Sequence, residues 1–179
     1  MKRFCVYCGS NSGVDPAYIQ AATELGRLIA ESGAGLVYGG ASVGLMGAIA
    51  DAVMDNGGEV IGVIPQAIVE LELAHSALTD LRVVADMHER KAMMAELSDG
   101  FVAMPGGVGT LEEIFESLTW LHLGLHDKPC ALFNVNAYYD SLINFLNQSV
   151  AEGFVKQSSL DKLFVTDQAA QLVDLLNAG

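Results

Sequence analysis

Residues 100–113 have the sequence GFVAMPGGVGTLEE, and this stretch decides the fold. Its first part, Gly100–Met104, is an apolar run that predicts a buried strand, and the amphipathic run Leu111–His122 predicts a helix. The glycines between them allow close approach to the backbone, and the N–H groups of a first helical turn attract anions. The stretch therefore predicts a strand, a phosphate-binding turn and a helix, with Glu112 and Glu113 in its first turn.

The same residues also have a purely structural interpretation. Thr110-Leu111-Glu112-Glu113 matches a Thr-x-x-Glu capping box, and acidic side chains suit the positive end of a helix dipole. In this alternative Glu113 only caps the helix, and the turn binds nothing. Both interpretations stay open at this point.

Strand-like and helix-like runs alternate along the rest of the chain. Strands are expected at Arg3–Cys8, Gly35–Tyr38, Val60–Ile64, Leu81–Val84, Gly100–Met104, Pro129–Phe133 and Leu163–Val165. Helices are expected near Ala17–Glu31, Gly44–Asn56, Met87–Leu97, Leu111–Leu123, Tyr138–Glu152 and Asp167–Asn177. Continuous apolar strands are typical of parallel sheets covered on both faces. The alternation therefore predicts a Rossmann-like α/β fold, a parallel sheet with helices on both faces, as a single domain over residues 1–179.

Two more glycine-bearing turns follow predicted strands, GSNSG at 9–13 and GGASVG at 39–44. Because ligands bind beyond the carboxyl ends of parallel strands, we expect all three turns to meet at one site, with Ser10, Gly39 and Gly40 among its contacts. Neither turn is a dinucleotide fingerprint, and a Walker lysine is missing. A mononucleotide or sugar phosphate therefore fits the site better than NAD or ATP.

The composition excludes several classes of protein. A hydrophobic fraction of 51% and a charged fraction of 17% exclude a disordered chain. No uncharged apolar stretch is long enough to span a bilayer, and the N-terminal residues show no signal-peptide cleavage pattern. With three cysteines, which suit a reducing compartment, we expect a cytoplasmic protein with no membrane partner. The net charge of −13 argues against a nucleic-acid partner.

The cysteines and histidines give little support for a metal site. Cys5 and Cys8 have Cys-x-x-Cys spacing, but in a strand they point to opposite faces, which favours core cysteines. His122 and His126 form an i, i+4 pair without a Glu-bearing metal motif around them. We expect no metal.

The helix expected to begin at Met87, after a capping box from Asp86 to Glu89, carries an arginine in its apolar stripe. At about 100° per residue, Arg90 shares one side with Met93 and Met94. Burial and the helix dipole both disfavour a guanidinium there, so Arg90 needs a carboxylate or phosphate partner, unless it snorkels at the edge of the stripe. Its neighbour Lys91 either joins it as an anion clamp or is solvated.

The helix after Thr110 has an unusual polar side. Its packing face is expected to comprise Leu111, Ile114, Phe115, Leu118 and Leu121, with Glu113, Glu116, Ser117 and Trp120 opposite. A tryptophan on an acidic side indicates that a partner subunit or a pocket wall covers it. A single, partly exposed tryptophan is the alternative.

Two segments together resemble the paired signature of a known family. Met87-His88-Glu89-Arg90-Lys91, followed by Pro105–Glu113, is similar to the signature of the LONELY GUY family, cytokinin riboside 5′-monophosphate phosphoribohydrolases that are often mislabelled as lysine decarboxylases. The resemblance also covers Cys8–Ser10, Tyr38–Gly40, Gly44–Gly47 and Glu72–His75, and so nearly the whole chain. It implies hydrolysis of the N-glycosidic bond of an adenine-type nucleoside 5′-monophosphate to free base and ribose 5-phosphate. No lysine is recognisably set up for pyridoxal phosphate, so we expect no cofactor.

The resemblance also implies the residues of the site. Arg90 and Glu113 would be the catalytic pair, in a homodimer whose sites lie near the subunit interface. The implied substrate contacts are Glu72, Lys91, Thr119 and the turn residues Gly106, Gly107, Val108, Gly109, Thr110, Leu111 and Glu112. Two other functions stay open: a broader phosphoribohydrolase such as an AMP nucleosidase, and a non-catalytic nucleotide-binding or carrier protein of the same fold.

Overall fold

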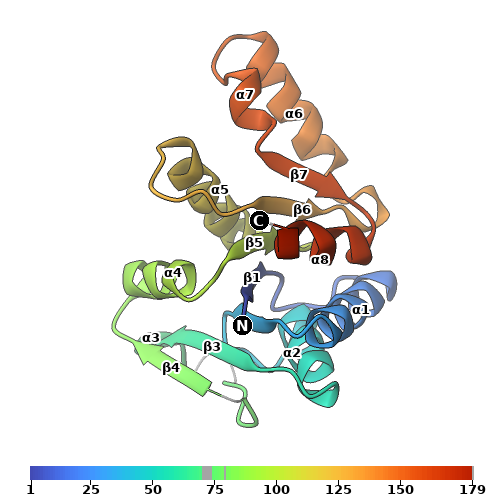
Figure 1. Ribbon diagram of the computed structural model, residues 1–179, viewed down its shortest axis with the longest axis vertical. Coiled ribbons are helices and arrows are strands. Elements are labelled where there is room, and N and C mark those ends of the chain that lie inside the picture. Colours follow the sequence, from blue (N-terminus) through green and yellow to red (C-terminus); the bar gives the residue numbers. More distant parts are fainter. Residues whose placement is uncertain (70–73, 79, 179) are drawn as a thin grey trace.

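A computed structural model describes residues 1–69, 74–78 and 80–178 of the chain. Seven parallel strands form one sheet in the order β4-β3-β2-β1-β5-β6-β7, with β4 at the lower edge in Figure 1 and β7 at the upper one. The strands are β1 (Arg3–Tyr7), β2 (Gly35–Tyr38), β3 (Val60–Pro65), β4 (Asp80–Val84), β5 (Gly100–Ala103), β6 (Cys130–Phe133) and β7 (Leu163–Thr166). The central strand β1 pairs with β2 on one side and with β5 on the other, so the strand order reverses between β1 and β5.

Helices cover both faces of the sheet, which confirms the predicted fold class. The long helices are α1 (Ala17–Glu31), α2 (Gly44–Asp55), α4 (Met87–Glu96), α5 (Val108–His122), α6 (Asp140–Ala151) and α8 (Ala169–Ala178). Three short ones are α3 (Gln66–Val69), the 3₁₀ helix η1 (Val135–Ala137) and α7 (Gln157–Leu160). One core cluster lies between the sheet and α1, α2 and α8, and a second lies under α4, α5 and α6. Figure 1 shows α4 and α5 on the side of the sheet opposite α1 and α8.

The cysteines follow the expected alternation of strand side chains. Cys5 belongs to the second core cluster and Cys8 to the first, so they do point to opposite faces of the sheet. Burial raises the pKa of all three thiols, that of Cys130 to about 12. Within the described ranges, no group of three or more His, Cys, Asp and Glu side chains is placed to hold a metal ion.

No helix in those ranges is long and apolar enough to cross a membrane.

Helix α5 differs from the prediction at its start and in its packing face. It begins at Val108, three residues before Leu111, with Gly107 as its N-cap and no side-chain cap. The predicted Thr110–Glu113 capping box is therefore wrong, because Thr110 lies inside the helix and is buried. Ser117, expected on the polar side, is also buried. Trp120 is half-buried and packs against the second core cluster of its own chain. Residues of the same chain therefore cover part of the Trp120 side chain.

Candidate active site

A cavity of about 440 Å³ lies at the carboxyl ends of β1 and β5, where the strand order reverses. The first and third glycine-bearing turns line it directly, together with side chains from α1, α2, α4 and α5. Leu45, which directly follows the second turn, donates its N–H to the carbonyl of Gly9 in the first turn at 3.1 Å. The first and third turns are joined by a 3.1 Å hydrogen bond from the N–H of Gly9 to the carbonyl of Pro105. The first and third turns therefore line the cavity, whereas the second turn, expected at the same site, lies behind them and contributes no lining residue.

Two glycines of the third turn leave space for a ligand. Gly107 and Gly109 line the cavity, and a Cβ added to either would meet no atom within 4 Å. Gly107 has φ −93° and ψ −155°, an extended conformation that any residue adopts. Packing and backbone geometry therefore do not require glycine at 107, whereas close approach of a ligand to the backbone would require it. No side chain caps α5, and Gly109 and Thr110 of its first turn line this space, so the cavity lies at an uncapped helix N-terminus of the kind that binds anions.

Replacing Gly107 with valine tests this explanation. We expect Gly107→Val to keep the thermal unfolding midpoint within a few degrees, because a Cβ at this position meets no atom within 4 Å and the cavity lies beyond it. The KM for a nucleoside 5′-monophosphate should rise at least about tenfold, equivalent to roughly 1.4 kcal/mol of lost binding. The control is Val108→Ala, since the neighbouring side chain is 85% exposed and does not line the cavity. Unchanged KM in folded Gly107→Val would contradict a phosphate at this turn.

Arg90 reaches the cavity wall from α4 and is only 6% exposed. The helix begins as predicted, with the Asp86 carboxylate accepting hydrogen bonds from the N–H groups of His88 and Glu89 at 2.8 and 2.9 Å. The guanidinium of Arg90 donates through Nε to the carbonyl of Val63 at 3.0 Å and through Nη2 to that of Gly39 at 3.2 Å. The arginine is thus buried rather than snorkelling, and two main-chain carbonyls orient it without neutralising its charge.

The position of the Arg90 guanidinium also explains the glycine at position 39. A Cβ at Gly39 would collide with the Arg90 guanidinium, which lies directly over this residue. Gly40 has a φ of +84° and packs beneath, against Ile64 and Leu81. These two predicted contact residues therefore support Arg90 and the second turn, and they do not themselves line the cavity.

Lys91 has a different position from its neighbour Arg90. Its side chain is buried between α4 and α5, where Nζ forms ion pairs with Glu112 and, at 3.1 Å, with Glu116. Burial alone would lower the pKa of Lys91, but the hydrogen bonds to the two carboxylates raise it above its ordinary value. Of the predicted arginine–lysine clamp, only Arg90 lines the cavity. Lys91 instead ties the helix that carries Arg90 to the helix that carries Glu113.

Glu113 faces the cavity from α5 and is half-buried. The Ser117 hydroxyl, one helical turn further along α5, donates to the main-chain carbonyl of Glu113 at 3.1 Å. The same hydroxyl lies 3.0 Å from the phenolic oxygen of buried Tyr7. Cys8 also lines the cavity, but burial raises the pKa of its thiol, so a thiolate nucleophile is disfavoured. The arrangement offers a carboxylate, a guanidinium and a helix N-terminus around one cavity.

The other predicted site residues divide into three groups. Those that line the cavity with Arg90 and Glu113 are Ser10, Gly106, Gly107, Gly109 and Thr110. Those that do not are Val108, Leu111, Glu112 and Thr119. Thr119 is exposed on α5, and its hydroxyl donates to the carbonyl of Phe115 at 2.6 Å. Glu72 lies outside the described residues.

Sequence reasoning missed two aromatic residues at the cavity. Tyr18 and Tyr138 both line it, with their rings edge to face and 5.8 Å between centroids. The pattern had placed Tyr138 in a helix, but α6 begins two residues later, at Asp140. Asn136 was an available signal, because asparagine tolerates the left-handed backbone conformation that this loop adopts.

The fold and the cavity place the chain among Rossmann-like α/β proteins whose ligand site lies where the strand order reverses. Its fold is similar to that of the molybdenum cofactor carrier protein from Chlamydomonas reinhardtii, with a TM-score of 0.75 and 22% identity over 99% of this chain and 96% of that one. The molybdenum cofactor binding protein from Rippkaea orientalis gives a TM-score of 0.74 and 22% identity, over 99% of this chain and 97% of that one. At such identities the likeness concerns the fold alone.

Sequence comparison goes further than the fold. Residues 46–176 match a family described as "Possible lysine decarboxylase". A protein of Rhodococcoides fascians named cytokinin riboside 5′-monophosphate phosphoribohydrolase is 52% identical over 165 residues, covering 92% of this chain and 83% of its own. An Arabidopsis thaliana protein with the same enzyme name is 47% identical over 175 residues, covering 98% of this chain and 82% of its own. The chain therefore belongs to the cytokinin riboside 5′-monophosphate phosphoribohydrolase family.

Proposed function

We propose that this protein hydrolyses the N-glycosidic bond of adenine-type nucleoside 5′-monophosphates of the cytokinin riboside class. The products are the free base and ribose 5-phosphate. The observation that carries the proposal is one cavity lined by Arg90, Glu113 and an uncapped, glycine-lined helix N-terminus. The enzyme name shared by relatives of 47–52% identity supports the same reaction.

The N-terminus of α5 is suited to the phosphate of the substrate. Its N–H groups and the positive end of the helix dipole attract an anion, and Gly107 and Gly109 leave room for close approach. Cleavage of an N-glycosidic bond passes through an oxocarbenium-like transition state, which a nearby carboxylate stabilises. We assign that role to Glu113, which also orients the water that adds to C1′ as the bond to the base breaks. The water releases one proton as it adds, and the departing base takes up one, so the reaction balances.

Arg90 completes this arrangement. Its buried guanidinium lines the same cavity as Glu113 and anchors an anionic group of the substrate. The decarboxylase description of the family fits the cavity poorly. Pyridoxal phosphate needs a lysine to form its Schiff base, and no lysine of the described chain lines the cavity. Lys91, adjacent to Arg90, is held in ion pairs with Glu112 and Glu116.

A panel of nucleosides and nucleotides tests the reaction and the phosphate site together. We expect free base to be released from AMP and isopentenyladenosine monophosphate with kcat/KM at least about 100-fold above the matching nucleosides. One to two charge-assisted hydrogen bonds to phosphate, at roughly 1.5–3 kcal/mol each, account for such a ratio. Similar kcat/KM for adenosine and AMP would contradict the phosphate site. Higher kcat/KM with AMP than with the prenylated nucleotide would favour the AMP nucleosidase alternative. Binding of the nucleotides without release of free base would favour a non-catalytic carrier.

We further propose that the protein acts in the cytoplasm as a homodimer. Three buried thiols suit a reducing compartment, and exposed apolar side chains, Leu123 and Leu125 after α5, offer surface for a second copy. Light scattering at micromolar concentration is expected to give twice the 18.9 kDa chain mass. A fully active monomer at this concentration would contradict the dimer.

A further inference from the structure

We propose that Tyr138 is a positioning residue for the third glycine-bearing turn. Its hydroxyl holds the Gly106–Gly107 peptide in the orientation that receives the substrate phosphate. The inference rests on the proposed phosphate site but not on hydrolysis itself. It is carried by one contact, a 2.6 Å hydrogen bond from the Tyr138 hydroxyl to the carbonyl of Gly106.

The Tyr138 ring is held firmly although the side chain is 44% exposed. It packs edge to face against Tyr18 on one side and against Tyr139, at 5.0 Å between centroids, on another. Tyr139 is itself fixed, because its buried hydroxyl donates to the carbonyl of Met104 at 2.6 Å. Two consecutive tyrosines of the β6–α6 loop therefore bind the main chain on both sides of Pro105, at the entrance to the turn.

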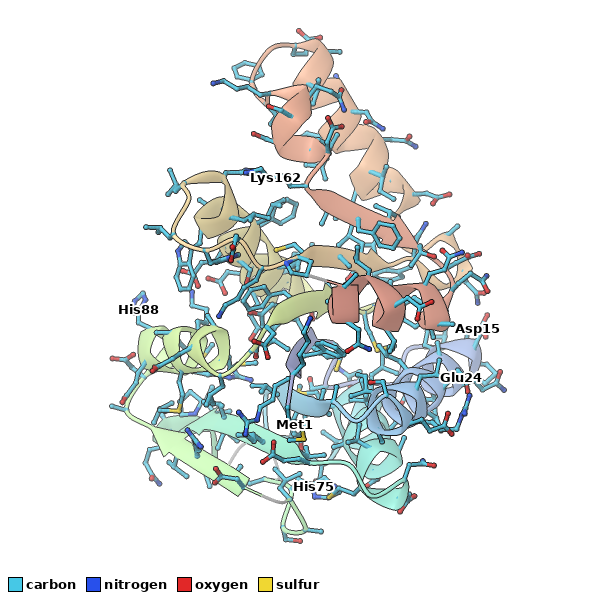
Figure 2. All side chains as sticks on the ribbon, in the orientation of Figure 1. Met1, Asp15, Glu24, His75, His88 and Lys162 are labelled. Atoms are coloured by element: carbon cyan, nitrogen blue, oxygen red, sulfur yellow. The ribbon has the colours of Figure 1, made fainter. Side chains whose placement is uncertain are left out.

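The loop that delivers Tyr138 is strained. Asn136 and Ala137 have φ of 51° and 57°, the two non-glycine residues with positive φ in the described part of the chain. Such conformations persist where surrounding contacts enforce them, and they concentrate at functional sites. Here the Asn136 amide donates to the Asp15 carboxylate at 3.1 Å, and Figure 2 labels Asp15 near the start of α1. The strain is thus maintained at the residues that place Tyr138 over the turn.

The hydrogen-bonded peptide is one whose orientation matters. A trans peptide unit carries its C=O and N–H on opposite sides, so fixing the Gly106 carbonyl also fixes the Gly107 N–H. A peptide between two glycines rotates easily, and rotation would turn a carbonyl oxygen toward the direction from which an anion is bound. Accepting a hydrogen bond at the C=O also strengthens the N–H as a donor. The Tyr138 hydroxyl thereby keeps an N–H rather than an oxygen available at the N-cap of α5.

The variant Tyr138→Phe keeps the ring and removes only the hydroxyl. Isothermal titration calorimetry with AMP, inorganic phosphate and adenosine, carried out with and without Tyr138→Phe in a Glu113→Gln background that suppresses turnover, measures binding alone. We expect the Kd for AMP and for phosphate to rise about tenfold, with the Kd for adenosine unchanged within a factor of two. In kinetics, KM for AMP should rise while kcat stays within about twofold.

Tyr139→Phe is the matched control, because it removes a neighbouring tyrosine hydroxyl that binds Met104, before the turn. It should lower the thermal unfolding midpoint and leave the ratio of the AMP and adenosine Kd values unchanged. Unchanged AMP affinity in folded Tyr138→Phe would overturn the inference. An equal rise in the Kd for AMP and for adenosine would overturn it too, because Tyr138 would then contact the base or the ribose rather than position the phosphate-binding turn. A wild-type protein that binds AMP without releasing base would refute the proposed reaction while leaving this test intact.

Discussion

Glu113→Gln is expected to lower kcat by two or more orders of magnitude, equivalent to about 3 kcal/mol of barrier, with the fold retained. Glutamine preserves the size of the side chain and removes the charge that we propose stabilises the oxocarbenium-like transition state. The substitution leaves the Ser117 hydrogen bond in place, because that bond is made to the main-chain carbonyl of Glu113. The measurement is kcat with saturating AMP, alongside circular dichroism to establish folding.

The start of α5 makes this result easier to interpret. Because Gly107 is the N-cap and Glu113 lies beyond the first turn, lost capping does not explain a fall in kcat. Glu112→Gln is the control, since Glu112 does not line the cavity and Lys91 retains Glu116 at 3.1 Å. It should keep kcat within a few fold. Wild-type turnover in folded Glu113→Gln would remove Glu113 from the mechanism.

Arg90→Ala is expected to lower kcat/KM by about three orders of magnitude, or about 4 kcal/mol of transition-state stabilisation. The variant loses the proposed anion anchor and its positive charge at the cavity that Glu113 also lines. It also leaves the carbonyls of Val63 and Gly39 without their guanidinium donor, so the thermal unfolding midpoint should fall. Measuring kcat/KM on the folded fraction separates the loss of activity from the loss of stability.

Two further arginine variants sharpen this experiment. Arg90→Lys restores the charge but lacks the planar fork that reaches both carbonyls, so we expect only partial recovery of kcat/KM. Arg82→Ala is the control, because Arg82 lies on β4 in an ion pair with Asp80 at 2.8 Å and does not line the cavity. Its kinetics should match the wild type. A folded Arg90→Ala variant with kcat/KM within tenfold of wild type would contradict the assigned role.

The sheet could be predicted closely because burial on both faces leaves a simple trace in the sequence. Each central strand is a short continuous apolar run, and a glycine or polar turn ends it. The start and end of α1 were predicted to the residue. Arg90 was predictable for the opposite reason, as a charge that interrupts an apolar stripe and so needs partners.

The rest depended on contacts between distant segments. Thr110 suits an N-cap by residue type, and only packing of the turn shows that its side chain is directed inward. The position of Lys91 between Glu112 and Glu116 depends on how α4 packs beside α5. Tyr138 reaches Gly106 through two left-handed residues, one of them an alanine, for which composition gives no warning.

Because the cavity lies where the strand order reverses, a ligand bound in it would stabilise the fold against unfolding. Strands β1–β4 lie on one side of the reversal and β5–β7 on the other, and α4 is the connection between them. Ser10 comes from the first half, Glu113 from the second and Arg90 from the connection itself. A nucleotide held by all three binds only when both halves are docked. At 100 times its Kd it would add about 2.7 kcal/mol to the free energy of unfolding, so substrate supply would itself protect the chain from proteolysis.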